Sequence, residues 1–448
     1  SPNGHSSNAA PHMMTPSATH THFQKVQTMK KLITNANVFN GVDNNLIENV
    51  SLLIEDNLIT QIGEVDATLA DEIIDAQGGT VMPGLIDAHV HITLSAPFNV
   101  IDTMTREEVA IRSAKISEEM LMRGFTTIRD VAGNTLGLKN SIDKGYATGP
   151  RILPSMAAIS QTCGHSDYRQ NQAQERLANG HEDSPMMKLG AMKVADGRSE
   201  VLKAVREQLF MGASQIKIMA GGGASSTFDP LDTLQFTSEE MKAAVDAASD
   251  YGTYVAAHIH TSDAMRRAAE AGVMSFEHAT IMDDDIAEII KEKGIWVIPS
   301  YFTSSLIAER KIPLPNEETY RKTERVGKAM FKSAKLIKKY DIQNIAFGTD
   351  CVGETNVHAT QLNELGAIEQ VFDTITALRM ATSNCGRLFE MSTYQHPYQE
   401  GKLGQIVEGA YADLLIIDGN PLESVACVAN TETQKLIMKD GKVYKNTL

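Results

Sequence analysis

Two hydrophobic patterns divide the chain. Residues 31–41 and 50–65 alternate apolar and polar positions between Asn/Gly turns, and residues 404–418 and 431–444 return to the same alternation. Alternation with a period of two is typical of short antiparallel strands. The pattern predicts a small β-sandwich domain built from both chain ends, with residues 29–82 as its N-terminal part and residues 392–448 as its C-terminal part.

Between these ends, short apolar runs alternate with segments of helical period, for example 200–211, 238–251 and 284–292. The apolar runs are 85–92, 127–131, 152–159, 215–220, 254–260, 275–279, 296–300 and 345–350. Eight strands that are mostly followed by helices predict an α/β fold, a (β/α)8 TIM barrel over residues 83–391. Barrel active sites lie at the C-terminal ends of the strands, so the long insert 161–198 after the third run is a candidate substrate-binding loop.

Residues 1–28 show neither pattern. The stretch is rich in Ser, His and Pro and lacks the apolar segment of a secretory signal. We expect a disordered leader or a cloning remnant, with Met14 and Met29 as alternative native starts. The four cysteines have no paired spacing, which favours free thiols in a reducing compartment. This predicts a cytoplasmic protein, or a periplasmic or secreted one if a signal peptide has been removed.

Composition excludes several classes of partner. The chain has 448 residues, of which 42% are hydrophobic, enough for a large barrel core and a second domain. Its formal net charge of −15 argues against nucleic acid or an anionic membrane surface as the main partner. No apolar run approaches the length of a membrane span. We therefore expect a small-molecule or dipeptide substrate.

The first predicted barrel strand ends in two histidines one residue apart, His89 and His91. Residues i and i+2 of a strand point to the same side, so both imidazoles can reach one metal ion. Such a pair also occurs by chance, and a strand histidine is more often an ordinary hydrogen-bonded polar residue. Alone, the pair is a weak metal-site signal.

Further candidate ligands occupy later strands. Lys217 lies in the fourth run, His258 and His260 in the fifth, His278 in the sixth, and Asp350 ends the eighth. Each of them could instead bond to the barrel rim or cap a helix. The ends of barrel strands converge on one axis, however, and nitrogen and oxygen ligands of this mix suit zinc or a similar divalent ion. The complete set therefore predicts a metal centre.

These motifs resemble the amidohydrolase superfamily, in its imidazolonepropionase-like and Xaa-Pro dipeptidase branch, which includes the ochratoxin-hydrolysing amidohydrolases. The resemblance covers about residues 30–448 and is carried by PGLIDAHVH, IKIMAGGG, AAHIH, EHAT, FGTD and GQIVEGAYADLLIIDGNPLE. It implies a binuclear enzyme with two zinc or similar divalent ions, and a homo-oligomer, with an octamer as one option.

The resemblance also assigns ligands. It implies that one metal is held by His89, His91 and Asp350. It implies that His258 and His278 hold the other, and that Lys217, carboxylated by carbon dioxide to a carbamate, bridges the two. His258 stands 20 positions before His278 and His260 stands 18, and the longer step fits the family better. His258 is therefore the preferred ligand, with His260 beside it as a supporting residue of the catalytic site.

In this scheme a hydroxide between the metals attacks the scissile carbonyl, and Asp350 is the acid/base that moves the proton to the leaving nitrogen. His165, in TCGHSD, sits where related peptidases carry GGHGD, and we expect it to steady the oxyanion. Its ordinary alternative is an exposed loop histidine. Thr162 and Cys163 depart from the family pattern at this point.

The substrate is expected to be a dipeptide or N-acyl amino acid with a free carboxylate, cleaved at its amide or peptide C–N bond, as by a Xaa-Pro dipeptidase, a carboxypeptidase or an ochratoxinase-like enzyme. Arg169 and Arg198 are candidate partners for that carboxylate, and Tyr301 and Phe236 are candidate apolar walls. The alternatives are a cyclic-amide or aryl-urea hydrolase, a mononuclear deaminase, for which Lys217 would be unexpected, and a non-catalytic binding protein on the same barrel.

Overall fold

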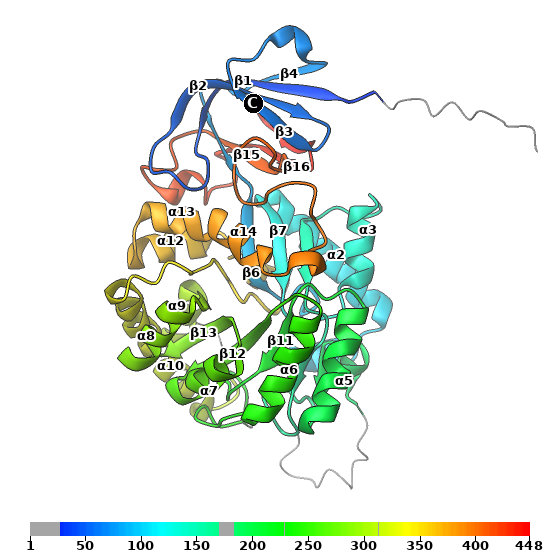
Figure 1. Ribbon diagram of the computed structural model, residues 1–448, viewed down its shortest axis with the longest axis vertical. Helices are drawn as coiled ribbons and strands as arrows, with labels where there is room; N and C mark the ends of the chain where they lie inside the picture. The colour runs from blue at the N-terminus through cyan, green and yellow to red at the C-terminus, as the bar shows by residue number, and fades with distance from the viewer. Residues whose placement is uncertain (1–26, 170–182, 228, 312) are drawn as a thin grey trace, which may run out of the picture.

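The computed structural model describes residues 27–169, 183–227, 229–311 and 313–448. Most of the predicted leader, residues 1–26, lies outside these ranges, as does the centre of the insert at 170–182. The described chain has two parts, a β domain at the top of Figure 1 and a larger β/α part below it. The blue and red colours of the upper part show that both ends of the chain build it.

Among the described residues, eight strands form the β domain as one sheet in the order β17-β16-β15-β5-β1-β2-β3, with β4 also paired to β1. They are β1 (Lys30–Val38), β2 (Ile47–Glu55), β3 (Leu58–Gly63), β4 (Glu72–Asp75), β5 (Thr80–Pro83), β15 (Leu414–Ile417), β16 (Gln434–Lys439) and β17 (Lys442–Asn446). The sheet has its own core, which includes Ile33, Leu52, Val81 and Leu414. The prediction that both chain ends share a β domain is confirmed, but the pairings give one mixed sheet where two stacked sheets were expected.

The β/α part follows the predicted alternation. Its strands are β6 (Leu85–Val90), β7 (Phe125–Asp130), β8 (Arg151–Pro154), β9 (Ala158–Ser160), β10 (Met192–Val194), β11 (Ile216–Met219), β12 (Val255–Thr261), β13 (Ser275–Ile281) and β14 (Trp296–Ile298). Its helices are α1 (Phe98–Ile101), α2 (Arg106–Met122), α3 (Leu136–Asp143), α4 (Pro185–Lys188), α5 (Gly197–Phe210), α6 (Ser238–Asp250), α7 (Ser262–Ala271), α8 (Asp284–Lys293), α9 (Tyr301–Ala308), α10 (Glu317–Lys339), α11 (Thr355–His358), α12 (Asn363–Val371), α13 (Thr374–Met380) and α14 (Ser383–Glu390). Short 3-10 helices are η1 (Ala67–Leu69), η3 (Thr393–Gln395) and η4 (Val425–Cys427).

Within the described ranges, these strands pair in parallel as two sheets, β6-β7-β8 and β10-β9-β11-β12-β13-β14. The sheets meet at the predicted third strand, which is broken at Met156, a residue with a φ of 60°. Before the break β8 pairs with β7, and after it β9 pairs with β11. The fold is therefore barrel-like, but the pairings do not make one continuous closed sheet.

The predicted eighth run, residues 345–350, is not a regular strand, yet it lies between β14 and β6. The backbone N–H of Ala346 donates to the carbonyl of Val297 at 3.1 Å, and the N–H of Ala88 donates to the carbonyl of Phe347 at 2.8 Å. The N–H of Asp350 donates to the carbonyl of His89 at 2.9 Å. These bonds place Asp350 directly beside the end of β6.

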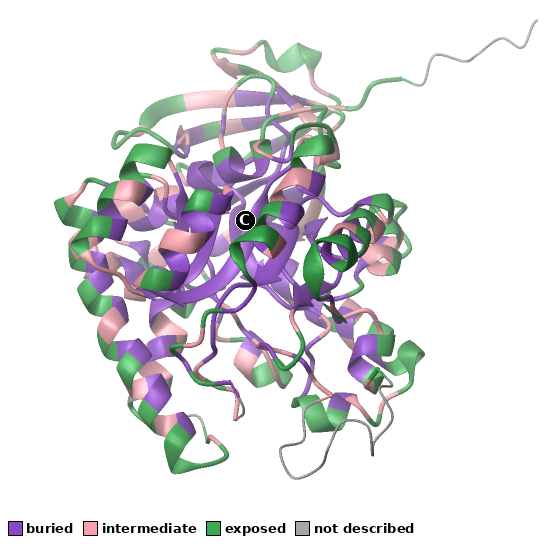
Figure 2. Ribbon diagram, turned by 60° about the horizontal axis from the view of Figure 1, so that its bottom comes forward, coloured by how far each residue is buried: buried purple, intermediate pink, exposed green. Residues whose placement is uncertain are grey.

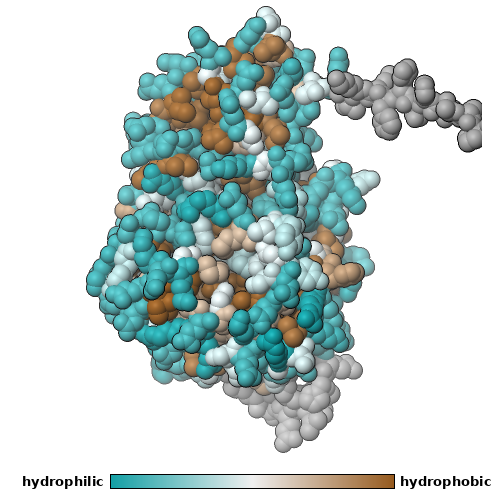
Figure 3. All heavy atoms as spheres, in the orientation of Figure 1, coloured by the Kyte–Doolittle hydropathy of each residue, from teal (hydrophilic) through white to brown (hydrophobic). Residues whose placement is uncertain are grey.

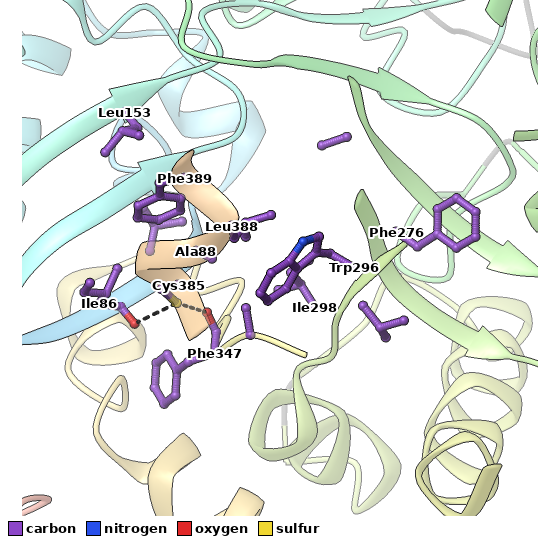
Figure 4. Close-up of a cluster of buried hydrophobic side chains, with 14 of the residues drawn as sticks. Ile86, Ala88, Leu153, Phe276, Trp296, Ile298, Phe347, Cys385, Leu388 and Phe389 are labelled. Atoms are coloured by element: carbon purple, nitrogen blue, oxygen red, sulfur yellow. Dashed lines mark hydrogen bonds between the residues drawn. The ribbon is translucent and has the colours of Figure 1, made fainter. Parts of the chain in front are cut away.

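The core lies between the strands and the surrounding helices. Figure 2 shows purple, buried strands at the centre and green, exposed outer faces on the helices. Figure 4 shows part of this core, where the Cys385 thiol of α14 lies 3.7 Å from the carbonyl oxygen of Ile86 and 4.0 Å from that of Phe347. Close packing of this kind fixes the strands, and with them the side chains at their ends.

On the face that Figure 3 shows, the barrel-like part is largely teal and therefore polar, with larger brown, apolar patches on the β domain at the top. No helix in the described part of the chain is both long and apolar enough to cross a membrane.

Candidate metal centre

The strand ends of the β/α part converge on a cavity of about 170 Å³. Its polar lining includes His89, His91, His165, Lys217, His258, His260, His278 and Asp350. Every predicted metal ligand is in this set, together with His165 and His260. Side chains from β6, β11, β12 and β13 and from the segment after β14 thus meet in one place, although the sequence separates them widely.

Asp350 lies close to two of the other candidate ligands. Its Oδ1 lies 3.2 Å from Nε2 of His89 and 3.2 Å from Nε2 of His91. Ligand atoms of His89, His278 and Asp350 all lie within 4.8 Å of one another, close enough to share an ion. The ring of His278 is 4.9 Å from that of His258 and 5.1 Å from that of His260, so both histidines of β12 remain candidates for the next ligand.

Hydrogen bonds fix the ring orientation of most of these histidines. Nδ1 of His89 lies 3.0 Å from Glu277, and Nδ1 of His260 lies 2.8 Å from the Thr280 hydroxyl. Nδ1 of His91 lies 3.4 Å from the Ala132 carbonyl. A histidine whose one nitrogen is held in this way keeps the other for a metal, and this arrangement is usual around metal ligands. These three rings therefore keep Nε2 for the cavity.

His258 is held through its other ring nitrogen, Nε2. Its Nε2 lies 3.1 Å from the carbonyl oxygen of Gly222. The nitrogen left for an ion is therefore Nδ1, whereas the neighbouring His260 keeps Nε2.

Sequence reasoning missed the support behind His89. Glu277, which is fully buried, accepts a short hydrogen bond from Arg129 and one from the Ser275 hydroxyl at 2.6 Å. Burial would raise the pKa of Glu277, but the Arg129 guanidinium and His89 lower it to about 2. The carboxylate therefore stays charged and can orient His89. Glu277 precedes His278 in the motif EHAT, and this adjacency was the available signal.

Burial keeps several candidate ligands in the form that binds metal. It lowers the pKa of His258 and of His278 well below the ordinary value, and it lowers that of His260 to about 3. Burial also lowers the pKa of Lys217 to about 8, so part of this amine is neutral near neutral pH. Neutral imidazoles, a carboxylate and a neutral amine make a donor set that fits a divalent ion such as zinc.

Two of these residues adopt left-handed backbone conformations. His278 has a φ of 74° and Asp350 has a φ of 53°. Conformations of this kind in non-glycine residues cost about 1–3 kcal/mol and persist where the surrounding structure enforces them, often at functional sites. Here they occur where β13 and the 345–350 segment present their polar side chains to the cavity.

His165 joins the cluster from the loop after β9. Its ring stacks on that of His258, with the centroids 4.1 Å apart and the planes 10° apart. Its Nδ1 lies 3.0 Å from Oδ2 of Asp229, a residue that sequence reasoning did not single out. The signal for Asp229 was its place in the loop after the glycines of IKIMAGGG.

The structure does not bring the predicted substrate-binding residues to the cavity. The guanidinium of Arg169 donates hydrogen bonds to the carboxylate of Asp167. Arg198 forms an exposed ion pair with Asp246 at 2.9 Å. Tyr301 is buried against Phe331 and Phe372. The reason is local, because Arg198 lies on the outer helix α5 and Tyr301 begins α9 with its ring in the core.

Phe236 is also buried and does not line the cavity. Apolar side chains do line it, and the larger ones include Leu94, Phe98, Tyr168, Met192, Met219 and Met330. The rings of Phe98 and Tyr168 lie 5.1 Å apart. Among the described lining residues there is no arginine.

Comparison with known proteins gives independent evidence on the family to which the chain is related. The model of the amidohydrolase family matches residues 80–444. Over 417 residues the chain is 29% identical to ochratoxinase of Aspergillus niger, an alignment that covers 90% of this chain and 84% of the relative. A solved prolidase in complex with N-methylphosphonate-L-proline is 34% identical, with a TM-score of 0.84 and coverage of 94% of this chain and 100% of that one. A solved Xaa-Pro dipeptidase with methionine in its active site is 31% identical, with a TM-score of 0.80 and coverage of 93% and 100%.

Proposed function

The chain belongs to the amidohydrolase family, and on that basis we propose that it is a binuclear metal-dependent hydrolase that cleaves the amide or peptide bond of a dipeptide or an N-acyl amino acid. The predicted likeness to the branch of ochratoxinase and the Xaa-Pro dipeptidases is confirmed, as is the prediction of an enzyme acting on C–N bonds. A non-catalytic role for the barrel is thereby set aside.

One observation carries the proposal. Asp350, His89 and His278 place ligand atoms within 4.8 Å of one another in a cavity that Lys217 also lines. Divalent metal use is typical of the family. We assign one ion to His89, His91 and Asp350 and the other to His258 and His278. Lys217, as a carbamate, would bridge them, since that modification turns a cation into an anion that metals attract.

When bound, divalent ions polarise the scissile carbonyl and lower the pKa of the attacking water. Asp350 accepts a proton from that water and returns it to the leaving nitrogen. Oδ1 of Asp350 faces two imidazoles at 3.2 Å, which leaves Oδ2 for the proton. His165 donates through Nε2 to the oxygen that becomes negative, and His260 holds the ring of its neighbour His278 by stacking.

The cavity's apolar lining favours substrates with an apolar or aromatic group next to the scissile bond. The names of the relatives, ochratoxinase and Xaa-Pro dipeptidase, support this class. The alternative is an aryl urea or a cyclic amide, which carries no α-carboxylate. The observation that favours this alternative is that no arginine lines the described part of the cavity. The presence of Lys217 argues against a mononuclear deaminase.

An activity screen tests the proposal. The zinc-loaded protein is assayed with Xaa-Pro dipeptides, dipeptides ending in Lys or Arg, N-acyl aromatic amino acids and ochratoxin A. A phenylurea and a cyclic amide are assayed beside them as substrates of the alternative class. We expect hydrolysis of at least one α-amino acid amide and loss of that activity after chelation. Faster turnover of the urea or the cyclic amide would contradict the proposed substrate class.

The same assay can test recognition of the carboxylate. We expect amidation of the substrate's C-terminus to lower kcat/KM by roughly tenfold or more, the size of a lost charge-assisted hydrogen bond. Equal rates on the acid and its amide would show that the carboxylate is not recognised.

A further inference from the structure

The loop after β11 contains three consecutive glycines, and two of them have no room for a side chain. A Cβ on Gly222 would lie 1.9 Å from the carbonyl oxygen of Pro230. A Cβ on Gly223 would lie 2.0 Å from Cε1 of His165. The loop therefore folds back on itself at Gly222, and the His165 ring packs directly against Gly223.

Asp229 lies at the centre of this folded loop and is 4% exposed. Its Oδ2 accepts hydrogen bonds from Nδ1 of His165 at 3.0 Å and from the backbone N–H of Gly223 at 2.8 Å. Its Oδ1 accepts a short one from the Ser226 hydroxyl. Gln235 completes the arrangement, because its Oε1 accepts from the backbone N–H of His165 at 2.6 Å. His165 is thus held at its ring and at its backbone.

A buried lysine from another element fixes the loop. Lys322 of α10 donates from Nζ to the carbonyl oxygens of Gly223 at 2.9 Å, Ser226 at 2.7 Å and Asp229 at 3.1 Å. An ammonium group has three N–H donors, so these carbonyls use all of them. Lys322 therefore anchors both ends of the turn that carries Asp229.

The same loop reaches the metal centre. The carbonyl oxygen of Gly222 lies 3.1 Å from Nε2 of His258, and the ring of His258 stacks on that of His165 at 4.1 Å. One short segment thus determines the relative position of a candidate metal ligand and of the residue assigned to the oxyanion.

We propose that Asp229 is a positioning residue for His165, and that Lys322 holds the loop in which Asp229 can act. This inference rests on the function proposed above. With Nδ1–H of His165 on the Asp229 carboxylate, Nε2 is the atom presented to the substrate. Each ring nitrogen then faces an oxygen, Nδ1 the Asp229 carboxylate and Nε2 the oxygen that becomes negative.

A double-mutant cycle tests the proposal on the zinc-loaded full chain. The variants are Asp229→Ala, Asp229→Asn, His165→Ala and the combination of Asp229→Ala with His165→Ala. We expect Asp229→Ala to lower kcat by about 10- to 100-fold, part of what the loss of an oxyanion donor costs, with KM and metal content within twofold. Asp229→Asn should recover part of the loss, since its amide oxygen still accepts from Nδ1. In the His165→Ala background, Asp229→Ala should change kcat by less than twofold.

Asp232→Asn is the matched control. Asp232 is an exposed aspartate three residues after Asp229 in the same loop. It pairs with Arg325 of α10, the helix that also carries Lys322. We expect its kcat within twofold of that of the parent protein. Lys322→Met should also lower kcat, because Lys322 holds the loop that carries Asp229.

Two results would overturn the inference. The first is an equal fall in kcat from Asp229→Ala with and without His165, which would make Asp229 a structural residue of the loop only. The second is a crystal structure of Asp229→Ala in which the His165 ring keeps its stack on His258. This second test needs no turnover, so it also decides the matter if the parent protein hydrolyses none of the amides and the proposed function itself fails.

Discussion

Lys217 combines a cationic side chain with an environment that excludes water, since it is 2% exposed in a cavity also lined by histidines. If it bridges two ions as a carbamate, Lys217→Ala removes a ligand of both. We expect metal affinity to fall by more than the roughly 10- to 100-fold that follows loss of an outer partner of a metal ligand, and activity to fall with it. Metal analysis after gel filtration measures the first effect, with the exposed Lys203→Ala as the control.

A carboxylate supplied from outside distinguishes a missing ligand from a damaged fold. Short-chain carboxylic acids should restore part of the activity of Lys217→Ala, because they can occupy the space of the carbamate. Full metal occupancy in the variant, or an unmodified ammonium in a metal-loaded crystal structure, would refute the bridging role.

Asp350 offers a second test at the level of one residue. Asp350→Asn keeps the size of the side chain but can no longer accept or return a proton. We expect kcat to fall by about 10²- to 10⁴-fold, with an unchanged far-UV circular dichroism spectrum. Turnover is compared at saturating zinc, because the amide is also a poorer ligand. A near-native kcat at full metal loading would exclude Asp350 as the acid/base.

The residues of the cavity were predictable from sequence where strand geometry alone determines their place. His89 and His91 end a strand, and a barrel brings such ends together. Asp229 was not predictable in this way, because its contact with His165 depends on how two loops fold against each other. Arg198 and Tyr301 show the converse, since their chemistry suited a substrate. The outer helix α5 carries Arg198 away from the cavity, and the start of α9 directs the Tyr301 ring into the core.

Among the secondary-structure elements, the runs of apolar residues gave the positions of the strands, while backbone detail decided their regularity. The third run breaks because Met156 has a φ of 60°. The eighth run holds its place through single hydrogen bonds to β6 and β14 instead of a regular ladder. An apolar run has the same composition in either state, so hydrophobic periodicity could not reveal these irregularities.

A glycine inside one helix and a glycine at the end of another predict opposite effects for the same substitution. Gly366 lies inside α12 with nothing within 4 Å of an added Cβ, whereas Gly294 ends α8 in the left-handed conformation with a φ of 67°. Gly366→Ala should raise the free energy of unfolding by about 0.5–1 kcal/mol, because alanine loses less backbone entropy on folding. Gly294→Ala should lower it by about 1–2 kcal/mol, because an L-residue is strained there. Urea denaturation measures both, and effects of the same sign would contradict the assigned conformations.

For the molecule as a whole, the contact between the two parts determines how firmly the chain ends are attached to the barrel-like part. Arg151 of β8 donates from Nε to Asp413 at 2.8 Å and from a terminal nitrogen to Asp440 at 2.7 Å. Its guanidinium also lies 3.9 Å from the centre of the Tyr411 ring. Lys439 adds a bond to the carbonyl oxygen of Gly149 at 2.6 Å. A charged network thus joins the C-terminal strands to the β/α part, and it is buried except at Asp440, which is half exposed.

Removing one member of this network should leave a buried charge without its partner. We expect Arg151→Met to lower the free energy of unfolding by about 3–5 kcal/mol, the usual effect of breaking a buried ion pair. The double variant with Asp413→Asn should recover part of that loss, because the unpaired carboxylate is gone. Arg198→Met is the control, since its pair with Asp246 is exposed and such pairs contribute about 0–1 kcal/mol. If the two arginine variants were equally stable in urea denaturation, the attachment of the β domain would rest on its apolar contacts, and the ion pairs would add nothing measurable.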